Sequence, residues 1–216
     1  IRFIPGVVPA IYWLIQMWTQ KEESVLIMPP VYYPFFNSIK ETGRQLVECP
    51  LLKEDEHYKM DIELFENKIL TENVKVFILC SPHNPVGRVW TKKELQAVLD
   101  ICKKYGVYVI ADEIHQDIIM SGYEKVTAAT CGNYDEYLIT LTSASKSFNI
   151  AGFQCAYAII PNDKMREDYD RLAKKLHFTE GNSFSYIATQ AVYEHGRPWL
   201  ESVCNIVESN YYYLKN

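Results

Sequence analysis

The sequence predicts an α/β fold in three layers (α/β/α), with a mostly parallel sheet covered by helices on both faces. Short apolar runs typical of strands alternate with longer segments whose apolar residues recur at helical spacing. The runs 76–80 and 107–111 are apolar at every position, as expected of strands that are buried on both faces of a parallel sheet. Polar residues follow directly after several of these runs. In such sheets, ligands bind beyond the carboxyl ends of the strands.

Length and charge favour small-molecule chemistry. With 216 residues and 48% hydrophobic content, the chain can bury a full core. Its net charge of -5 and the absence of a basic stripe argue against a nucleic-acid or anionic-membrane surface. No segment approaches about 18 consecutive apolar residues, and no signal-peptide pattern opens the chain, so no membrane span is expected. Because the chain begins at Ile1 and stops inside a helical pattern, we expect an internal piece of a longer protein.

The cysteines indicate a reducing, cytoplasmic setting. They lie far apart without a C-x-x-C motif, and four have apolar surroundings typical of buried free thiols. The six are Cys49, Cys80, Cys102, Cys131, Cys155 and Cys204.

The elements follow in order from periodicity and end signals. Asp61 is expected to cap one helix, and Thr91 with Glu94 forms a capping box for another, which Gly106 ends. Strands are predicted at 3–6, 25–28, 44–49, 76–80, 107–111, 137–141 and 155–160. Helices are predicted at about 7–18, 61–70, 91–105, 163–178, 183–195 and from 198 onward. A further helix is predicted after the second strand and ends at residue 42. The charged segment 51–60 predicts a loop.

Lys146 stands in the sequence T-S-A-S-K-S-F-N-I-A-G, directly after the strand 137–141. A strand that delivers one amine into a turn of small residues gives it a partly desolvated setting, which lowers its pKa and makes it nucleophilic. This is what a Schiff-base lysine requires. The alternative is an ordinary surface lysine after a strand.

Asp112 and Asn84 also follow strand-like runs, in I-A-D-E-I-H-Q-D and C-S-P-H-N-P-V-G-R-V. Asn84, Asp112 and Lys146 are the polar groups that a pyridoxal phosphate ring needs: a partner for the ring oxygen, a carboxylate for the pyridine nitrogen, and an amine. The alternatives are that Asp112 caps a following helix and that Asn84 forms an Asx turn.

A phosphate site is expected where the first strand turns into the first helix, at G-V-V-P-A-I. The free N–H groups of a helix start form an anion site. Any strand-to-helix junction could look the same. The hydroxyls of Ser143 and Ser145 could also reach phosphate, or serve only as turn residues.

Together, G-V-V-P-A, P-V-Y, H-N-P-V-G-R-V-W, A-D-E-I-H-Q-D, S-A-S-K-S-F-N-I-A-G and S-Y-I-A-T-Q resemble the fold-type I pyridoxal phosphate enzymes over essentially the whole chain. H-N-P-x-G, D-E-I and S-K are shared with class I/II aminotransferases. The remaining motifs are similar to those of the MalY/PatB-type C–S lyases (cystathionine β-lyase-like). The resemblance implies a cofactor-binding large domain at 1–195 and, at 196–216, the start of a helix that leads to a small domain.

The resemblance also implies roles for residues. Lys146 would form the internal aldimine, Asp112 would pair with the pyridinium nitrogen, and Asn84 would bind the ring oxygen. Further cofactor contacts are implied for Tyr32 (stacking on the ring), for Val7, Val8 and Ser143 (phosphate), and for His115 (near the ring oxygen). Many aminotransferases have an arginine where this chain has Gln154, so its phosphate binding would rely more on backbone N–H groups.

The implied activity is α,β-elimination on a cystathionine- or cysteine-type amino acid, giving a thiol, pyruvate and ammonia. The alternatives are transamination and a regulatory module that binds the cofactor without required turnover. A homodimer with the active site at the subunit boundary is also implied. The aromatic residues Trp13, Trp18, Tyr32 and Phe35 are expected to be exposed at that boundary.

Overall fold

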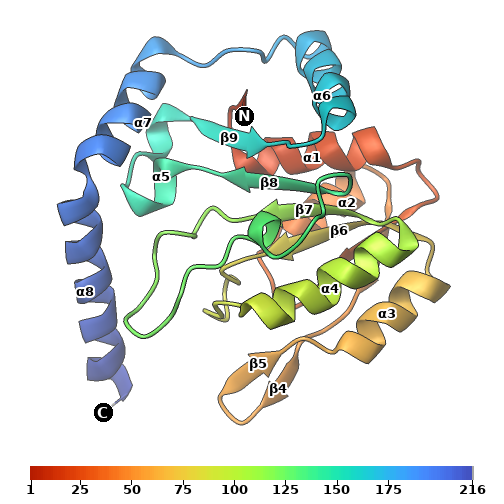
Figure 1. The fold of residues 1–216 in the computed structure, drawn as a ribbon, viewed down its shortest axis with the longest axis horizontal. Helices are drawn as coiled ribbons and strands as arrows, with labels where there is room; N and C mark the ends of the chain where they lie inside the picture. The colour runs from red at the N-terminus through yellow and green to blue at the C-terminus, as the bar shows by residue number, and fades with distance from the viewer. Residues whose placement is uncertain (216) are drawn as a thin grey trace.

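The computed structural model describes residues 1–215 and has a seven-stranded sheet at its centre, in the order β1-β9-β8-β7-β6-β2-β3 (Figure 1). The four pairings from β3 to β8 are parallel, whereas β9 runs antiparallel to both β8 and β1. The predicted mostly parallel sheet is therefore confirmed. Its strands are β1 (Arg2–Ile4), β2 (Ser24–Ile27), β3 (Gln45–Glu48), β6 (Val74–Cys80), β7 (Tyr108–Asp112), β8 (Leu138–Thr142) and β9 (Ala156–Ile159).

Helices cover both faces of this sheet. Those on one face are α1 (Val7–Trp18), α2 (Pro34–Glu41) and α6 (Asp163–Lys175), and those on the other are α3 (Ile62–Thr71) and α4 (Lys92–Tyr105). The remaining helices are α5 (Ala144–Ser147), α7 (Ser183–His195) and α8 (Arg197–Lys215). Two short 3-10 turns, η1 (Ala128–Thr130) and η2 (Ala151–Phe153), lie in the loops. The expected three layers are thus present.

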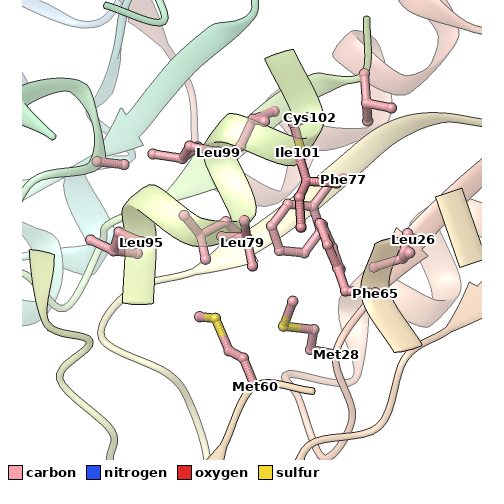
Figure 2. Packing of buried hydrophobic residues seen from close by; sticks show 14 of the residues in the cluster. Leu26, Met28, Met60, Phe65, Phe77, Leu79, Leu95, Leu99, Ile101 and Cys102 are labelled. Atoms are coloured by element: carbon pink, nitrogen blue, oxygen red, sulfur yellow. The ribbon is translucent and has the colours of Figure 1, made fainter. Parts of the chain in front are cut away.

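The strand β6 shows why both faces need a cover. Because side chains alternate across a strand, Phe77 and Leu79 point to one face, while Val76 and Ile78 point to the other. Phe77 and Leu79 pack with α3 and α4, a cluster that Figure 2 shows around Phe65 and Leu99. The side chains of Val76 and Ile78 belong to a second buried cluster with α1, α2 and α6. Each cluster stabilises the fold by about 25 cal/mol for every Å² of apolar surface that it removes from water.

The predicted helix ends are confirmed in detail. The Asp61 side chain accepts a hydrogen bond from the Leu64 N–H, and Thr91 and Glu94 form a complete capping box at the start of α4. Gly106 ends α4 with a φ of 68°, a conformation that glycine adopts without steric cost.

Two element predictions were wrong. The segment 51–60, expected as a loop, contains a two-stranded hairpin of β4 (Leu52–Glu54) and β5 (His57–Lys59). Most of its residues are exposed, so it lacks the apolar alternation that signals a strand; Tyr58 packs against the core beneath it. The helix α6 also ends earlier than expected, at Lys175, because His177 takes a positive φ of 56°.

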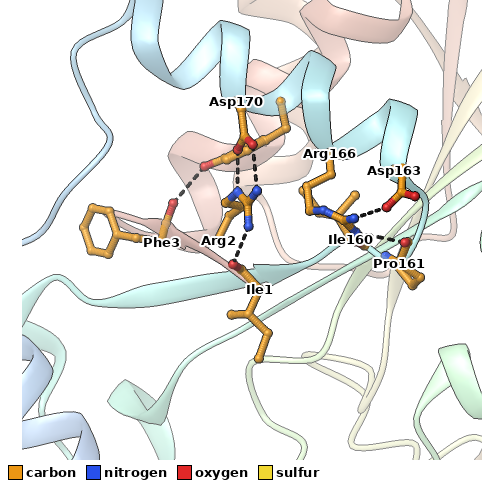
Figure 3. A network of polar contacts seen from close by, with 9 residues as sticks. Ile1, Arg2, Phe3, Ile160, Pro161, Asp163, Arg166 and Asp170 are labelled. Atoms are coloured by element: carbon orange, nitrogen blue, oxygen red, sulfur yellow. Dashed lines mark hydrogen bonds and ion pairs between the residues drawn. The ribbon is translucent and has the colours of Figure 1, made fainter.

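The first strand is fixed to α6, although the two lie far apart in the sequence (Figure 3). The guanidinium of Arg2 donates to both carboxylate oxygens of Asp170, and the Tyr169 hydroxyl donates to the Phe3 carbonyl at 2.8 Å. On the same helix, Arg166 donates to the carbonyls of Ile160 and Pro161. These bonds hold β1 at the edge of the sheet and thereby fix where α1 begins.

The last two helices pack differently from the others. They lie along one side of the sheet (Figure 1), where α7 buries only Ser185 and no described residue of α8 is buried. The exposed apolar side chains concentrate there: Phe184, Tyr186, Ile187, Tyr193, Trp199, Ile206, Val207, Tyr211, Tyr212, Tyr213 and Leu214. Within residues 1–215, no helix has the length and apolar content needed to cross a membrane.

The aromatic residues expected to be exposed near the first turn are not exposed. Phe35 is fully buried, and Trp13, Trp18 and Tyr32 are half-buried. Trp18 stacks on Tyr108 with ring centroids 4.6 Å apart. Their apolar surface is used inside the fold, so this observation no longer supports a subunit boundary.

Candidate active site

The strands β6, β7 and β8 end in register. Cys80 pairs with Asp112, and Asp112 pairs with Leu141. Because the three strands are parallel, the turns that follow them leave the same edge of the sheet. Asp112 is the last residue of β7, and the segments that follow the three strands carry Asn84, His115 and Lys146. Residues far apart in the sequence therefore lie at one edge of the sheet.

Asp112 is the buried carboxyl group of this edge. The residue is only 5% exposed, and its Oδ1 accepts a hydrogen bond from the Ile114 N–H at 3.1 Å. Burial raises the pKa of Asp112 to about 7, while the Ile114 N–H and the positive charge of Lys146 act in the opposite direction. Turns follow Asp112, not a helix, so the alternative that it caps a helix is wrong. A buried carboxyl without a cation needs a proton or a positively charged partner.

Lys146 lies on the single helical turn α5, between the buried Ala144 and Ser147. Its charge acts on both Asp112 and His115, lowering the pKa of each after the larger effect of burial. Its side chain, however, is exposed. The expected partial desolvation of this amine is therefore not found in residues 1–215, because α5 lies at the rim of the sheet and its outer side is left open to solvent.

Ser143 is the N-cap of α5 and is almost fully buried. Its hydroxyl donates to the Cys155 carbonyl at 2.7 Å and accepts from the Ser145 N–H at 3.0 Å. To donate to a phosphate, the hydroxyl would have to turn away from Cys155. Its present bonds hold α5 against the start of β9.

The start of α1 presents free N–H groups. Val7 and Val8 are the first two helical residues, and Pro9 has no N–H. Gly6, the N-cap, has no side chain with which to satisfy them, and no side-chain cap is formed. Its own carbonyl accepts the Ala10 N–H at 3.3 Å. The N–H groups of Val7 and Val8 are thus available to an anion.

Asn84 and Tyr32 lie on two turns that His83 joins. The buried His83 ring has its Nε2 at 3.1 Å from the Pro30 carbonyl, just before Val31 and Tyr32. Desolvation lowers the pKa of His83 to about 4, so the ring is neutral at pH 7. The Asn84 side chain makes no hydrogen bond within the described part of the chain, so the Asx-turn alternative is not found there.

The pKa values of Tyr32 and His115 are both shifted by charged groups of this site. Tyr32 is half-buried; desolvation raises its pKa, and the charges of Tyr33 and Asp112 add to the effect. For His115, desolvation lowers the pKa, and the Lys146 charge lowers it further. Both residues therefore lie close enough to the charges of the site to respond to them.

Sequence reasoning missed several residues that hold the site together. The loop after Asp112 is tied to the segment around Lys146 through Glu113, Gln116, Asp117, Thr142 and Ser147. The signal was available, because polar residues that continue directly after a buried strand need partners at the same edge. The groove lined by Trp18, Tyr108 and Arg171 lies at the opposite edge of the sheet and includes none of the candidate residues.

The donor set suits one kind of ligand. A buried carboxyl with a raised pKa suits a protonated ring nitrogen, a primary amine suits a carbonyl carbon, and uncapped helix N–H groups suit a phosphate. Asn84 offers an amide to a further ring substituent. These observations fit a phosphorylated pyridine aldehyde.

Comparisons with known proteins agree with this chemistry. The cystathionine beta-lyase PatB of Bacillus subtilis (strain 168) is 36% identical over 211 residues, which are 97% of this chain and 54% of that protein. The structure of cystalysin from Treponema denticola, which contains a pyridoxal 5'-phosphate cofactor, has a TM-score of 0.95 at 36% identity, covering 99% of this chain and 54% of cystalysin. A PLP-bound protein from Clostridium difficile 630, designated an aminotransferase, has a TM-score of 0.93 at 43% identity, covering 97% and 54%.

The chain spans about half the length of the relatives it matches. Over that half, the match extends across the whole fold, including every strand that positions a candidate residue. The sequence model described as aminotransferase class I and II matches residues 1–213, and the chain belongs to that family.

Proposed function

We propose that the protein containing this chain is a pyridoxal phosphate-dependent C–S lyase. The observation that carries the proposal is the register of β6, β7 and β8, in which Cys80 pairs with Asp112 and Asp112 pairs with Leu141. This register brings Asn84, Asp112 and Lys146 to one edge of the sheet. When bound, pyridoxal phosphate supplies an electron sink for negative charge that develops at Cα of an amino acid. The chain's own residues bind it, orient it and move protons.

Asp112 would hold the pyridine nitrogen in its protonated form. Burial of Asp112, which raises its pKa, makes the carboxylate costly without a cation at this position. A pyridinium N–H would offset that cost, and the Ile114 N–H already fixes one carboxylate oxygen. The charged pair would then remain at the working pH.

Lys146 would first carry the cofactor and then act as the general base that takes the Cα proton from the substrate. Its place on the short helix α5, just after β8, would let its long side chain bring the amine to the cofactor. Its exposure in residues 1–215 also leaves it open to an incoming substrate amine.

The remaining contacts would orient the cofactor. The N–H groups of Val7 and Val8 would bind the phosphate, with Ser143 as a further donor once its hydroxyl turns from Cys155. Asn84 would bind the ring oxygen, with His115 nearby, and Tyr32 would stack on the ring. Gln154, exposed and without a charge, leaves more of the phosphate binding to the backbone.

The proposed substrate is a small amino acid with sulfur at Cβ, such as cystathionine, cleaved to a thiol, pyruvate and ammonia. Its support is the similarity to PatB. Transamination is the second candidate, because the Clostridium difficile protein is designated an aminotransferase. Both use the same base, and they differ in whether a thiolate leaves.

For the whole protein we propose a cytoplasmic homodimer in which residues 1–195 form the cofactor-binding domain and residues 196–216 begin the connection to a small domain. The six free thiols, four of them buried, support a reducing compartment. The exposed apolar side chains of α7 and α8 support a partner surface on those helices. Asn216 lies outside the described residues.

The discriminating experiment incubates the full-length protein with cystathionine and no keto acid, and measures pyruvate with a coupled dehydrogenase assay. Elimination gives pyruvate and a free thiol in equal amounts. A protein that forms no pyruvate, but exchanges amino groups when 2-oxoglutarate is added, is an aminotransferase. The Lys146→Ala variant is the control for both activities.

A further inference from the structure

The loop between β7 and η1, residues 113–127, is tied to the Lys146 segment at three points. The Gln116 amide donates to Thr142 Oγ1 at 2.9 Å, and the Thr142 hydroxyl donates to the Glu113 carbonyl at 3.2 Å. The third bond runs from the Ser147 hydroxyl to Asp117 Oδ2 at 3.0 Å. Each bond joins residues that are 26 to 30 positions apart in the sequence.

The bond between Ser147 and Asp117 lies next to Lys146. Ser147 is only 1% exposed, and it is the last residue of α5. A helix of four residues cannot hold its own orientation, because nucleating one turn is unfavourable without tertiary support. The Ser143 hydroxyl supports the start of this turn, and Asp117 supports its end.

Asp117 is itself held in place. Its other carboxylate oxygen, Oδ1, lies 2.9 Å from Lys125 Nζ on the same loop, and the Asp117 side chain is 16% exposed. The loop follows directly after Asp112, the last residue of β7, and carries His115. One loop therefore sets the positions of the buried carboxyl and the histidine, and it binds the turn that presents the amine.

We propose that Asp117 and Ser147 are positioning residues that fix Lys146 relative to Asp112. This inference rests on the proposed function, in which Lys146 and Asp112 contact the cofactor. The hydrogen bond to a carboxylate is charge-assisted and about twice as strong as a neutral one. It limits rotation of α5 and thereby holds the Lys146 amine in one orientation relative to Asp112.

The test compares full-length wild-type protein with Ser147→Ala. The readouts are the visible circular dichroism of bound pyridoxal phosphate, which reports a fixed orientation, and the dissociation constant of the cofactor. We expect a weaker visible signal per bound cofactor and an affinity that falls about tenfold, which corresponds to about 1.4 kcal/mol. The thermal midpoint of the apoprotein should change little, because alanine fits the space of serine.

Ser121→Ala is the matched control. Ser121 lies on the same loop and donates to Glu208 Oε2 at 2.8 Å, an equivalent bond that ends on α8 instead of α5. This variant should keep the wild-type dichroism and affinity. In the Asp117→Ala variant, the further substitution Ser147→Ala should cause almost no additional loss of dichroism or cofactor affinity, because the bond between the two residues is already lost.

The outcomes separate the two proposals. If wild-type protein does not bind pyridoxal phosphate at Lys146, the proposed function fails. If it does, and Ser147→Ala matches Ser121→Ala in dichroism and cofactor affinity, the positioning role is wrong. A loss of signal in Ser147→Ala alone, with non-additivity in the double variant, supports it.

Discussion

Asp112 pairs with Cys80 across the parallel strands β7 and β6, at the last rung that the two strands share. The pairing sets a buried carboxyl beside the turn that carries Asn84. On its other side, Asp112 pairs with Leu141, five residues before Lys146. The three polar groups of the candidate site are therefore placed by backbone register and not by contacts among themselves.

Asp112→Asn should lower turnover far more than cofactor binding. Asparagine can hydrogen-bond the pyridine nitrogen but cannot keep it protonated. Each unit of pKa lost at that nitrogen is worth about 1.4 kcal/mol, or about tenfold in rate. We expect a loss of about a hundredfold or more in turnover. Steady-state kinetics and a cofactor titration measure the two effects.

Asp61→Asn is the control for that variant. Asp61 caps α3 through the Leu64 N–H, and asparagine is an equally good N-cap. Its turnover should remain close to wild type. Near-normal turnover in Asp112→Asn as well would mean that Asp112 is only a structural residue.

Glu113→Gln should change how stability depends on pH. Glu113 is 1% exposed; its Oε1 accepts the Ala128 N–H at 2.7 Å, and its Oε2 is buried without a partner in the described chain. Burial raises its pKa to about 7 from 4.5. The folded state therefore holds the proton more tightly than the unfolded state, and stability falls as pH rises from 4.5 to about 7, by up to about 3 kcal/mol.

Glutamine cannot ionise and still offers an oxygen to Ala128. Urea unfolding of the apoprotein at pH 5 and pH 7.5 should show a smaller difference for Glu113→Gln than for wild type. An unchanged difference would show that Glu113 is ionised in the folded protein at both pH values.

His83→Phe should also change how stability depends on pH, because His83 makes stability rise with pH whereas Glu113 makes it fall. The distance from Nε2 to the Pro30 carbonyl fits a neutral ring that carries its proton on Nε2. Desolvation lowers the pKa to about 4 from 6.5, so stability is present above pH 6.5 and is lost as pH falls towards 4. Phenylalanine keeps the edge-to-face packing on Trp90 but leaves the Pro30 carbonyl unpaired.

The variant should lose about 1–3 kcal/mol at pH 7, and its loss of stability on acidification should be smaller. Thermal unfolding between pH 4 and pH 7 tests both. If His83→Phe and wild type lost the same stability on acidification, another group would be responsible.

Gly196→Ala should disturb the junction between α7 and α8. A Cβ at Gly196 would overlap the Val192 carbonyl oxygen and would lie 2.6 Å from the ring of Phe148, which follows α5. Neither the backbone nor the buried ring can move freely. We expect a loss of about 1–3 kcal/mol, or several degrees in thermal midpoint.

Gly152→Ala is the control, because a Cβ there would meet no atom of residues 1–215 within 4 Å, apart from its two neighbours in the chain. It should keep the wild-type midpoint. Equal midpoints for the two alanine variants would mean that the junction of α7 and α8 adapts to the added methyl group.

The sequence predicted the buried strands well because a strand that is apolar at every position has to be covered on both faces. The apolar runs of β6 and β7 match a sheet covered on both sides, and the polar residue at each end then has only one edge to occupy. Asp112 was predictable for this reason. The direction of β1 and β9 was not, since apolar pattern alone does not distinguish antiparallel from parallel pairing.

Features that depend on tertiary contacts were missed. The hairpin of β4 and β5 is polar and exposed, so its residues carry no strand signal. Whether Lys146 is desolvated depends on what covers α5, and neighbouring residues in the sequence do not determine that. Phe35 was expected outside because aromatic residues gather near the first turn, but helical periodicity places it against the sheet.

The most direct test of this account is reduction of the full-length protein with borohydride in the presence of pyridoxal phosphate, followed by peptide mapping by mass spectrometry. We expect the reduced cofactor on Lys146, within the peptide that contains S-A-S-K-S, and no incorporation in Lys146→Ala. The cofactor on a different lysine, or equal incorporation in the variant, would contradict the assignment of this edge of the sheet as the active site.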